Sequence, residues 1–196
     1  MGRPPSFLLV LALLVLAGAL LVTPVHGALP LRIVSWGDND VYQVSQTPTG
    51  TGFKAITAGN AHSVALRTDG SIVSWGYVWF GLVSGTPTGT GFTAIAAGGD
   101  VSLALRADGS IASWGSDQYG QVSQTPSGTG FTAIAAGADH CLALRADGSI
   151  VSWGDDQYGQ VSQTPSGTGF TAIAAGWCHS LALSADGSIA SWWSDW

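Results

Sequence analysis

The sequence predicts an all-β fold, a β-propeller of antiparallel blades built from 39-residue repeats. Identical residues recur at this fixed interval, Gly is abundant with 28 residues, and charged residues make up only 9% of the chain, with no Glu. A period of this length is typical of propellers, solenoids and arrays, in which each copied unit buries its apolar faces against its neighbours. The most regular positions are Trp36, Trp75, Trp114, Trp153 and Trp192, and the turn glycines Gly70, Gly109, Gly148 and Gly187.

The first 27 residues are typical of a secretory signal peptide. Arg3 precedes an unbroken run of sixteen apolar or Gly residues, Phe7 to Val22, and small residues follow before Ala28. The alternative is an uncleaved membrane anchor, although sixteen residues is just short of the roughly 20 that a spanning helix needs. We therefore expect an apolar signal helix, a secreted or extracytoplasmic location, and membrane association only if the signal is uncleaved.

Residues 28–196 are expected to form one array, divided into repeats 31–74, 75–113, 114–152 and a fourth with a truncated end, 153–196. Four full intervals of this length fit in the chain, so the sequence predicts a partial or open propeller of about four blades. Strands bearing Trp are expected at both ends, over Leu31–Trp36 and Ser188–Trp192. This duplication fits a piece of a longer array, or a ring that a homo-oligomer completes.

Each repeat contains apolar runs separated by turn residues. The run 131–136 is apolar on both faces, as expected for a strand of a sheet that packs between two neighbours. The turn Ala146-Asp147-Gly148 predicts an antiparallel hairpin between Leu142–Arg145 and Ser149–Trp153, with both central residues of the turn at positive φ. A hairpin in every repeat favours blades of three or four strands over a parallel β-helix.

One string carries a family resemblance. The pattern G-x-x-H-[SC]-L-A-L-x-x-D-G-S-I-x-S-W-G, followed by D-Q-Y-G-Q, resembles the repeat of the regulator of chromosome condensation family over residues 31–196. The F-T-A-I-A-A-G strand and a Gln-x-x-x-x-Pro loop look closest to the short repeats of the β-lactamase inhibitor protein of type II and prokaryotic relatives. The resemblance implies a propeller that binds another protein through loops on one face, without chemistry of its own.

Charge excludes one class of partner. The net charge is -6, and without the leader five basic residues face twelve Asp. Nucleic-acid binding needs clustered Lys and Arg, whereas the Lys and Arg residues of this chain are spread over the repeats. We therefore expect no nucleic-acid partner.

Three histidines share one column, His62, His140 and His179, which Val101 interrupts. Near the axis of a propeller three imidazoles could bind zinc. The favoured alternative is structural, because each His follows a Gly turn at a strand start, where its ring can bond a backbone group. No metal or other cofactor is expected.

Two cysteines, Cys141 and Cys178, lie 37 residues apart in adjacent repeats. A disulfide is compatible with export, but Cys141 replaces the Ser of other copies in a buried strand, which favours two free thiols.

Acidic and hydroxyl side chains do not form a recognisable site. Residues 38–40 and 155–156 lack the ligand number and spacing of a Ca²⁺ loop, which favours solvated acids. No G-x-S-x-G motif and no triad spacing is present, and the polar residues recur in sibling repeats. The chain is therefore not expected to be an enzyme.

The second repeat departs most from its siblings. Where others read D-D-Q-Y-G-Q, it reads Y-V-W-F-G-L over residues 77–82. Aromatic residues dominate binding hot spots, so this loop and the equivalent tyrosines of the next two loops form the candidate binding face. The alternative is a loop buried against a neighbouring element. The candidate residues are Tyr77, Trp79, Phe80, Tyr119 and Tyr158.

These observations favour an exported, non-catalytic β-propeller scaffold that binds another protein through loops on one face. The alternatives are a carbohydrate-binding propeller of the lectin type, since aromatic rings with Asp, Asn and Gln suit sugars, and a fragment of a longer repeat protein.

Overall fold

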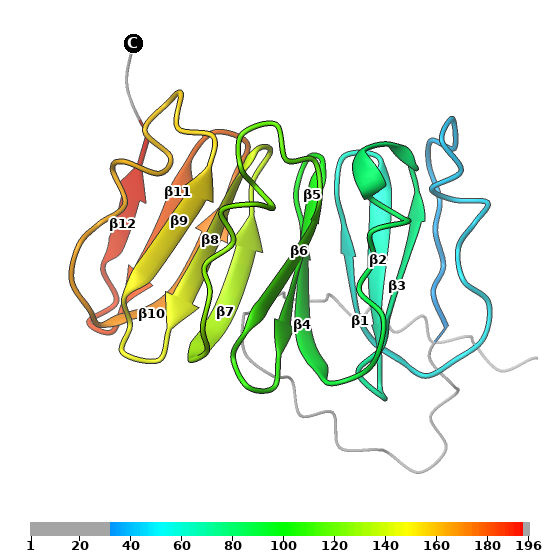
Figure 1. The fold of residues 1–196 in the computed structure, drawn as a ribbon, viewed down its shortest axis with the longest axis horizontal. Helices are drawn as coiled ribbons and strands as arrows, with labels where there is room; N and C mark the ends of the chain where they lie inside the picture. Colours follow the sequence, from blue (N-terminus) through cyan, green and yellow to red (C-terminus); the bar gives the residue numbers. More distant parts are fainter. Residues whose placement is uncertain (1–31, 194–196) are drawn as a thin grey trace, which may run out of the picture.

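A computed structural model describes residues 32–193 and shows four three-stranded antiparallel sheets arranged in a row (Figure 1). The predicted signal peptide and its helix lie outside these residues. The one helical segment within residues 32–193 is a single 3-10 turn, η1, Trp79–Gly81. The strands are β1 Phe53–Ala58, β2 His62–Arg67, β3 Ile72–Gly76, β4 Phe92–Ala97, β5 Val101–Arg106, β6 Ile111–Gly115, β7 Phe131–Ala136, β8 His140–Arg145, β9 Ile150–Gly154, β10 Phe170–Ala175, β11 Ser180–Ser184 and β12 Ile189–Trp192.

Each sheet is a meander of three consecutive strands, which confirms the predicted all-β blades. The predicted hairpin is β8 with β9, in which Leu144 pairs with Ile150. A folded unit runs from a Phe to the Gly that follows a Trp, so the predicted repeat limits at 75, 114 and 153 fall within third strands. Among residues 32–193 no helix has the length and hydropathy needed to cross a membrane.

The hairpin turns differ from the prediction in one detail. Only the Gly adopts positive φ, as at Gly148 with φ 80°, while Asp147 does not. The Arg145 N–H donates to the Ser149 carbonyl and the Gly148 N–H to the Arg145 carbonyl, so the turn has three residues instead of two. The Asp147 carboxylate accepts hydrogen bonds from the Ser149 N–H and hydroxyl, which stabilises this longer turn.

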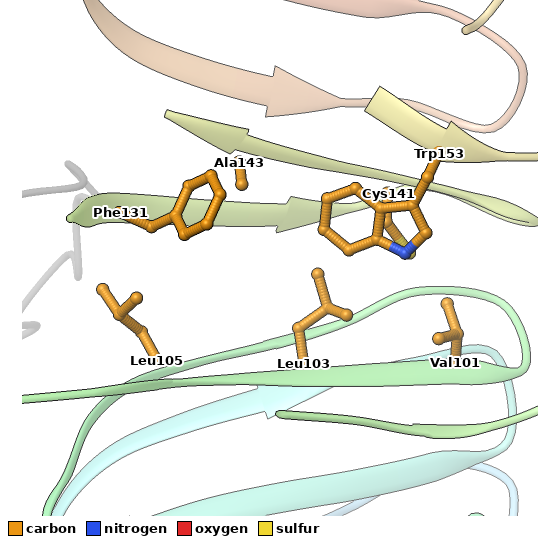
Figure 2. Packing of buried hydrophobic residues seen from close by; sticks show 7 residues of the cluster. All are labelled: Val101, Leu103, Leu105, Phe131, Cys141, Ala143 and Trp153. Carbon is orange, nitrogen blue, oxygen red and sulfur yellow. The ribbon is translucent and has the colours of Figure 1, made fainter. Parts of the chain in front are cut away.

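The sheets pack face to face with one repeated set of side chains. Residues at equivalent positions of different repeats are said to share a column. In each sheet the column of Leu105 lies on one face, called the front face, and the columns of Phe131 and Trp153 lie on the opposite, back face. The front face of each sheet packs on the back face of the next. Figure 2 shows this interface between the second and third sheets, where the leucines of β5 point at Phe131 and Trp153. The same columns form the two other interfaces between sheets. Identical columns therefore stack copies into one continuous core.

The row is open at both ends. In the fourth sheet the front-face Ile189 is 71% exposed, because none of the described residues covers it. At the other end, residues 32–36 cover only part of the first sheet, through Ile33 against Phe53 and Trp75. The strand predicted over Leu31–Trp36 is wrong for its described part, residues 32–36, and Trp36 is 83% exposed. A strand needs a paired neighbour, and residues 32–36 have none among those described.

Every first and third strand runs in the same direction, so the ends of the strands lie on two opposite sides of the molecule, which are named the hairpin edge and the loop edge. The hairpin edge carries the Asp-Gly turns that join second to third strands. The loop edge, uppermost in Figure 1, carries the short turns before β2, β5, β8 and β11 and the start of each long loop, residues 37–43, 77–82, 116–121 and 155–160. The candidate binding residues therefore all lie on the loop edge.

Candidate functional site at the loop edge

A Trp N–H anchors each long loop. The indole of Trp153 donates to the Gln121 carbonyl at 2.9 Å, and that of Trp114 donates to the Leu82 carbonyl at 3.0 Å. Trp75 and Trp192 make the same bond in their own repeats. All four indoles are at most 5% exposed. The Trp column thus stacks the sheets and also ties the long loops to their back faces.

Three of the four long loops are organised by polar side chains. In loop 116–121 the Asp117 carboxylate accepts the N–H groups of Val122 and Ser123, at 2.9 and 2.8 Å. The buried Gln121 amide accepts the Tyr119 N–H. The N–H groups of Ser123 and then Val122 hold the pKa of Asp117 below its usual value. Loop 155–160 repeats this arrangement with Asp156 and Gln160. In loop 37–43 Asn39 takes the place of the Asp and accepts the Val44 and Ser45 N–H groups, and Gln43 accepts the Val41 N–H. These three loops therefore fold on their own hydrogen bonds.

Loop 77–82 lacks both polar groups. Val78 stands in the column of Asp117, and Leu82 stands in the column of Gln121 and fills its buried position. The three side chains between Tyr77 and Gly81 point outward: Val78 is 60%, Trp79 65% and Phe80 55% exposed. Tyr77 is half-buried and stacks on Trp79, with ring centroids 6.4 Å apart. The result is a contiguous apolar surface in a position where the other long loops carry polar side chains.

Two further irregularities accompany this loop. Phe80 has φ 56°, in the left-handed region that bulky residues rarely adopt. Ser74, beneath the loop, is buried with no hydrogen-bond partner for its hydroxyl, whereas Ser113 in the same column bonds Thr125 at 2.7 Å. Loop 77–82 therefore lacks the side-chain hydrogen bonds that stabilise its siblings.

The remaining predicted residues lie on the same edge in the following loops. Tyr119 is 41% exposed and Tyr158 is half-buried. Two exposed aromatics on this edge were not among the predicted residues: Tyr42, 59% exposed in loop 37–43, and Trp177, 68% exposed in the turn before β11. Tyr42 stands in a column that is Gly in the other three repeats, and this irregularity could have identified it in the sequence. The column of Trp177 holds a different residue in each repeat and gives no such signal.

The His column is structural where it is buried. The His62 ring nitrogen Nε2 lies 2.7 Å from the Ser102 hydroxyl in the next sheet, and His140 bonds Ser180 in the same way. Burial lowers the pKa of both imidazoles to about 4. The prediction of a hydrogen-bonded structural role is correct, but the partner is a Ser of the next sheet instead of a backbone carbonyl. His179 is exposed on the open face.

Two irregular positions of the sequence occupy one interface. Val101 stands in the His column and Cys141 in the Ser column of the following sheet, and both are fully buried in the same cluster (Figure 2). A polar pair is thus replaced by an apolar pair. Cys141 and Cys178 are free thiols, and burial raises the pKa of Cys141. Within residues 32–193 no three His, Cys, Asp or Glu side chains are grouped so as to hold a metal.

An open hollow of about 580 Å³ lies at the N-terminal end of the row, between residues 32–36 and the back of the first sheet. Ile33, Ile56 and Trp75 line it. Whole sheets cover the equivalent surface of the other three, so the hollow is the incompletely covered back face of the first sheet.

Comparison with known proteins decides the family. The Regulator of chromosome condensation (RCC1) repeat matches residues 53–77, 92–121 and 131–160, which coincide with the first three sheets and their loops. Three successive repeats of the chain thus belong to this repeat family. No curated protein sequence matches the chain. The expected special likeness of these repeats to the β-lactamase inhibitor protein of type II is not borne out.

Solved structures confirm the propeller fold. Prp20p from Saccharomyces cerevisiae is 26% identical with a TM-score of 0.64, over 80% of this chain and 51% of that one. The CRINKLY WD40 ectodomain of receptor kinase ACR4 from Arabidopsis thaliana is 23% identical with a TM-score of 0.60, over 74% and 51%. The ectodomain of receptor kinase CR4 from Physcomitrella patens is 23% identical with a TM-score of 0.65, over 79% and 44%. This chain thus spans about half the length of these RCC1-like structures.

Proposed function

We propose that the protein is a non-catalytic scaffold that binds another protein through its loop edge, with Trp79 and Phe80 as the anchors. The observation that carries the proposal is the exposed apolar surface of loop 77–82, in which the polar groups that organise sibling loops are replaced. Large exposed aromatic side chains are the residues that contribute most to protein interfaces. A strained backbone at Phe80 is also typical of functional sites.

Related propellers support a protein partner. Prp20p binds Gsp1p and histones, and yeast RCC1 (Prp20) has been crystallised bound to Kap60. This chain carries the same type of repeat, and the loops of a repeat scaffold determine its partner more than the scaffold does.

The test replaces loop 77–82 with the equivalent loop of the next repeat. Changing residues 77–82 to the Ser-Asp-Gln-Tyr-Gly-Gln of residues 116–121 converts the apolar loop into one that this scaffold already folds. Random displayed peptides are selected on the wild-type protein and then tested on this variant and on Trp79→Ala. We expect selected peptides to lose at least about tenfold in affinity on both variants.

The matched control is Ile189→Ala, which removes an equally exposed apolar side chain from the opposite edge of the molecule. Its affinity for the same peptides should stay unchanged. Equal binding by wild type and the loop replacement, or no selected peptide at all, would contradict the proposal.

A carbohydrate is the second candidate, because Tyr77 stacked on Trp79 offers a platform on which a sugar ring could lie. A glycan array separates the two. Saturable glycan binding that free sugar displaces and that Trp79→Ala abolishes would replace the protein-binding proposal.

Export is part of the proposal and rests on residues 1–27. Expression of the whole chain followed by N-terminal sequencing of the protein outside the cytoplasm should give a new terminus near Ala28. Retention of Met1 in a membrane fraction would instead support an anchor.

A further inference from the structure

The two edges of the molecule differ in charge. The first strands of all four sheets run in the same direction, as do the second and the third strands. The position of a charged residue within its repeat therefore decides whether it lies on the loop edge or on the hairpin edge. Seven Asp residues lie on the loop edge, in the turns before second strands or in the first residues of the long loops. No Lys or Arg of residues 32–193 accompanies them. The acids are Asp38, Asp40, Asp100, Asp117, Asp139, Asp155 and Asp156.

Every Lys and Arg of residues 32–193 lies on the hairpin edge. Arg67, Arg106 and Arg145 end the second strands, and Lys54 is the second residue of β1. Arg32 stands one period before Ser71, in the column of the hairpin turns. Four acids share this edge with them, Asp69, Asp108, Asp147 and Asp186, each in a hairpin turn. The charge of the hairpin edge is therefore nearly balanced, whereas the loop edge carries acids alone.

The charges of the hairpin edge are also satisfied locally. The guanidinium of Arg106 lies 4.3 Å from the ring centroid of Phe92, and Arg67 and Arg145 occupy equivalent places over Phe53 and Phe131. Each Asp of the hairpin turns accepts hydrogen bonds from a following Ser. These groups therefore have structural partners within the chain. Most acids of the loop edge also accept hydrogen bonds from N–H groups, but no Lys or Arg of residues 32–193 lies on that edge to balance their charge.

The acids of the loop edge lie near enough to act together. Burial, and then the negative charges of Asp100 and Asp155, raise the pKa of Asp139. Asp139 and Asp155 flank strands of the third sheet and Asp100 precedes β5 of the second, so the repulsion extends from one sheet to the next. A surface of this kind attracts cations and basic segments and repels acidic ones.

The apolar loop lies between acids on both sides. Loop 37–43 with Asp38 and Asp40 precedes it, and the turn with Asp100 and the loop with Asp117 follow it in the next sheet. Trp79 and Phe80 thus present exposed rings within a negative field. Such a combination matches a Lys or Arg side chain, whose charged end contacts carboxylates or an aromatic face while its methylene stem packs on the ring.

From this placement we infer that the partner of the loop edge is a basic segment of another polypeptide, with its Lys or Arg side chains over loop 77–82 and beside Asp100 and Asp139. The inference rests on the proposed function and adds the chemistry of the partner. An acidic polypeptide would meet like charge along the whole edge, and a neutral one would gain no attraction from the seven carboxylates.

The test measures binding to three synthetic peptides of equal length that alternate Leu and Gly with Lys, Gln or Glu. We expect the Lys peptide to bind the full protein at least about tenfold more tightly than the Gln peptide, with an affinity that falls as salt is added. The Glu peptide should not bind. Equal affinities for the Lys and Gln peptides, or no binding by any of the three, would overturn the inference.

A pair of triple variants separates this surface from the net charge of the chain. Asp40→Asn with Asp100→Asn and Asp139→Asn removes three of the seven negative charges of the loop edge but spares Asp117 and Asp156, which hold loop backbones. Asp69→Asn with Asp108→Asn and Asp147→Asn removes the same charge from the hairpin edge. Both variants are first checked for an unchanged far-ultraviolet circular dichroism spectrum. We expect only the loop-edge variant to lose about tenfold in affinity for the Lys peptide.

Equal loss in both triple variants would show attraction to an acidic chain as a whole and would overturn the inference. Trp79→Ala distinguishes the two proposals. If it leaves the binding of every polypeptide unchanged, the proposed function fails. If it weakens binding but Lys and Gln peptides bind alike, the proposed function stands and the basic partner does not.

Discussion

Two irregular regions of the repeat array show opposite behaviour. At the interface between the second and third sheets, the replacement of His by Val101 is matched by the replacement of Ser by Cys141, and both side chains are fully buried. In loop 77–82 the replacements are not matched. The carboxylate and amide of the sibling loops are lost, Ser74 beneath the loop lacks a partner, and three large side chains are exposed. Paired replacements preserve packing, whereas unpaired ones at a surface mark a candidate binding site.

The largest effect is expected at the feature that both regions share, the Trp column. Trp153 is 3% exposed, packs between the second and third sheets and donates to Gln121. Trp153→Ala should lower the free energy of unfolding by about 3–5 kcal/mol in urea titrations. The exposed Trp79→Ala should change it by less than about 0.5 kcal/mol. Similar losses in the two variants would contradict the division between scaffold and binding surface.

The paired replacement can be transferred to another interface. His62→Val leaves the buried Ser102 hydroxyl without its partner, so it should lower the free energy of unfolding by about 1–3 kcal/mol. Adding Ser102→Cys should recover most of this loss, because Val101 and Cys141 already occupy the equivalent positions. A double-mutant cycle measures the coupling, and additive losses would show that the pairing of replacements has no energetic basis.

The same pair predicts a dependence of stability on pH. The folded-state pKa of His62 and of His140 is about 4, below the ordinary value of 6.5. Between about pH 6.5 and pH 4 the unfolded chain binds protons that the folded chain does not, so the free energy of unfolding falls as the pH falls through this window. Above pH 6.5 these groups contribute no slope.

The variant His62→Val with Ser102→Cys is the control for the pH experiment. It removes one of the two buried imidazoles, so its stability should fall less steeply than that of the wild type over the same window. An unchanged slope would mean that other groups carry the pH dependence.

A smaller effect is expected in the loops. Asp117→Ala removes the acceptor of two backbone N–H groups and should lower the free energy of unfolding by about 1 kcal/mol. Val78→Asp restores the carboxylate to the irregular loop, where the N–H groups of Val83 and Ser84 stand in the equivalent positions. It should raise stability by up to about 1 kcal/mol. Thermal unfolding compares both variants, and no gain from Val78→Asp would show that loop 77–82 follows a different backbone course for reasons beyond the missing acid.

Much of the fold could be predicted from the sequence because its signals are local and repeated. The Asp147-Gly148 turn and its alternating neighbours placed the hairpin, and the 39-residue period placed the copies. The strand expected over Leu31–Trp36 failed for the opposite reason. Its residues match the third strand of every repeat, but pairing requires a neighbour that the described residues do not supply. The aromatic loop was visible as a break in the period, although its exposure was not.

By itself, the sequence determined the repeat, the strand type and the columns that must be buried, since periodicity and turn chemistry act within one copy. Only the tertiary structure decided which columns of different copies meet. It brought His62 to Ser102 and Val101 to the Cys141 interface, exposed Trp79 and Phe80, and separated the acids from the bases on opposite edges. These outcomes depend on the stacking of whole sheets and on the common direction of their strands, which no single repeat contains.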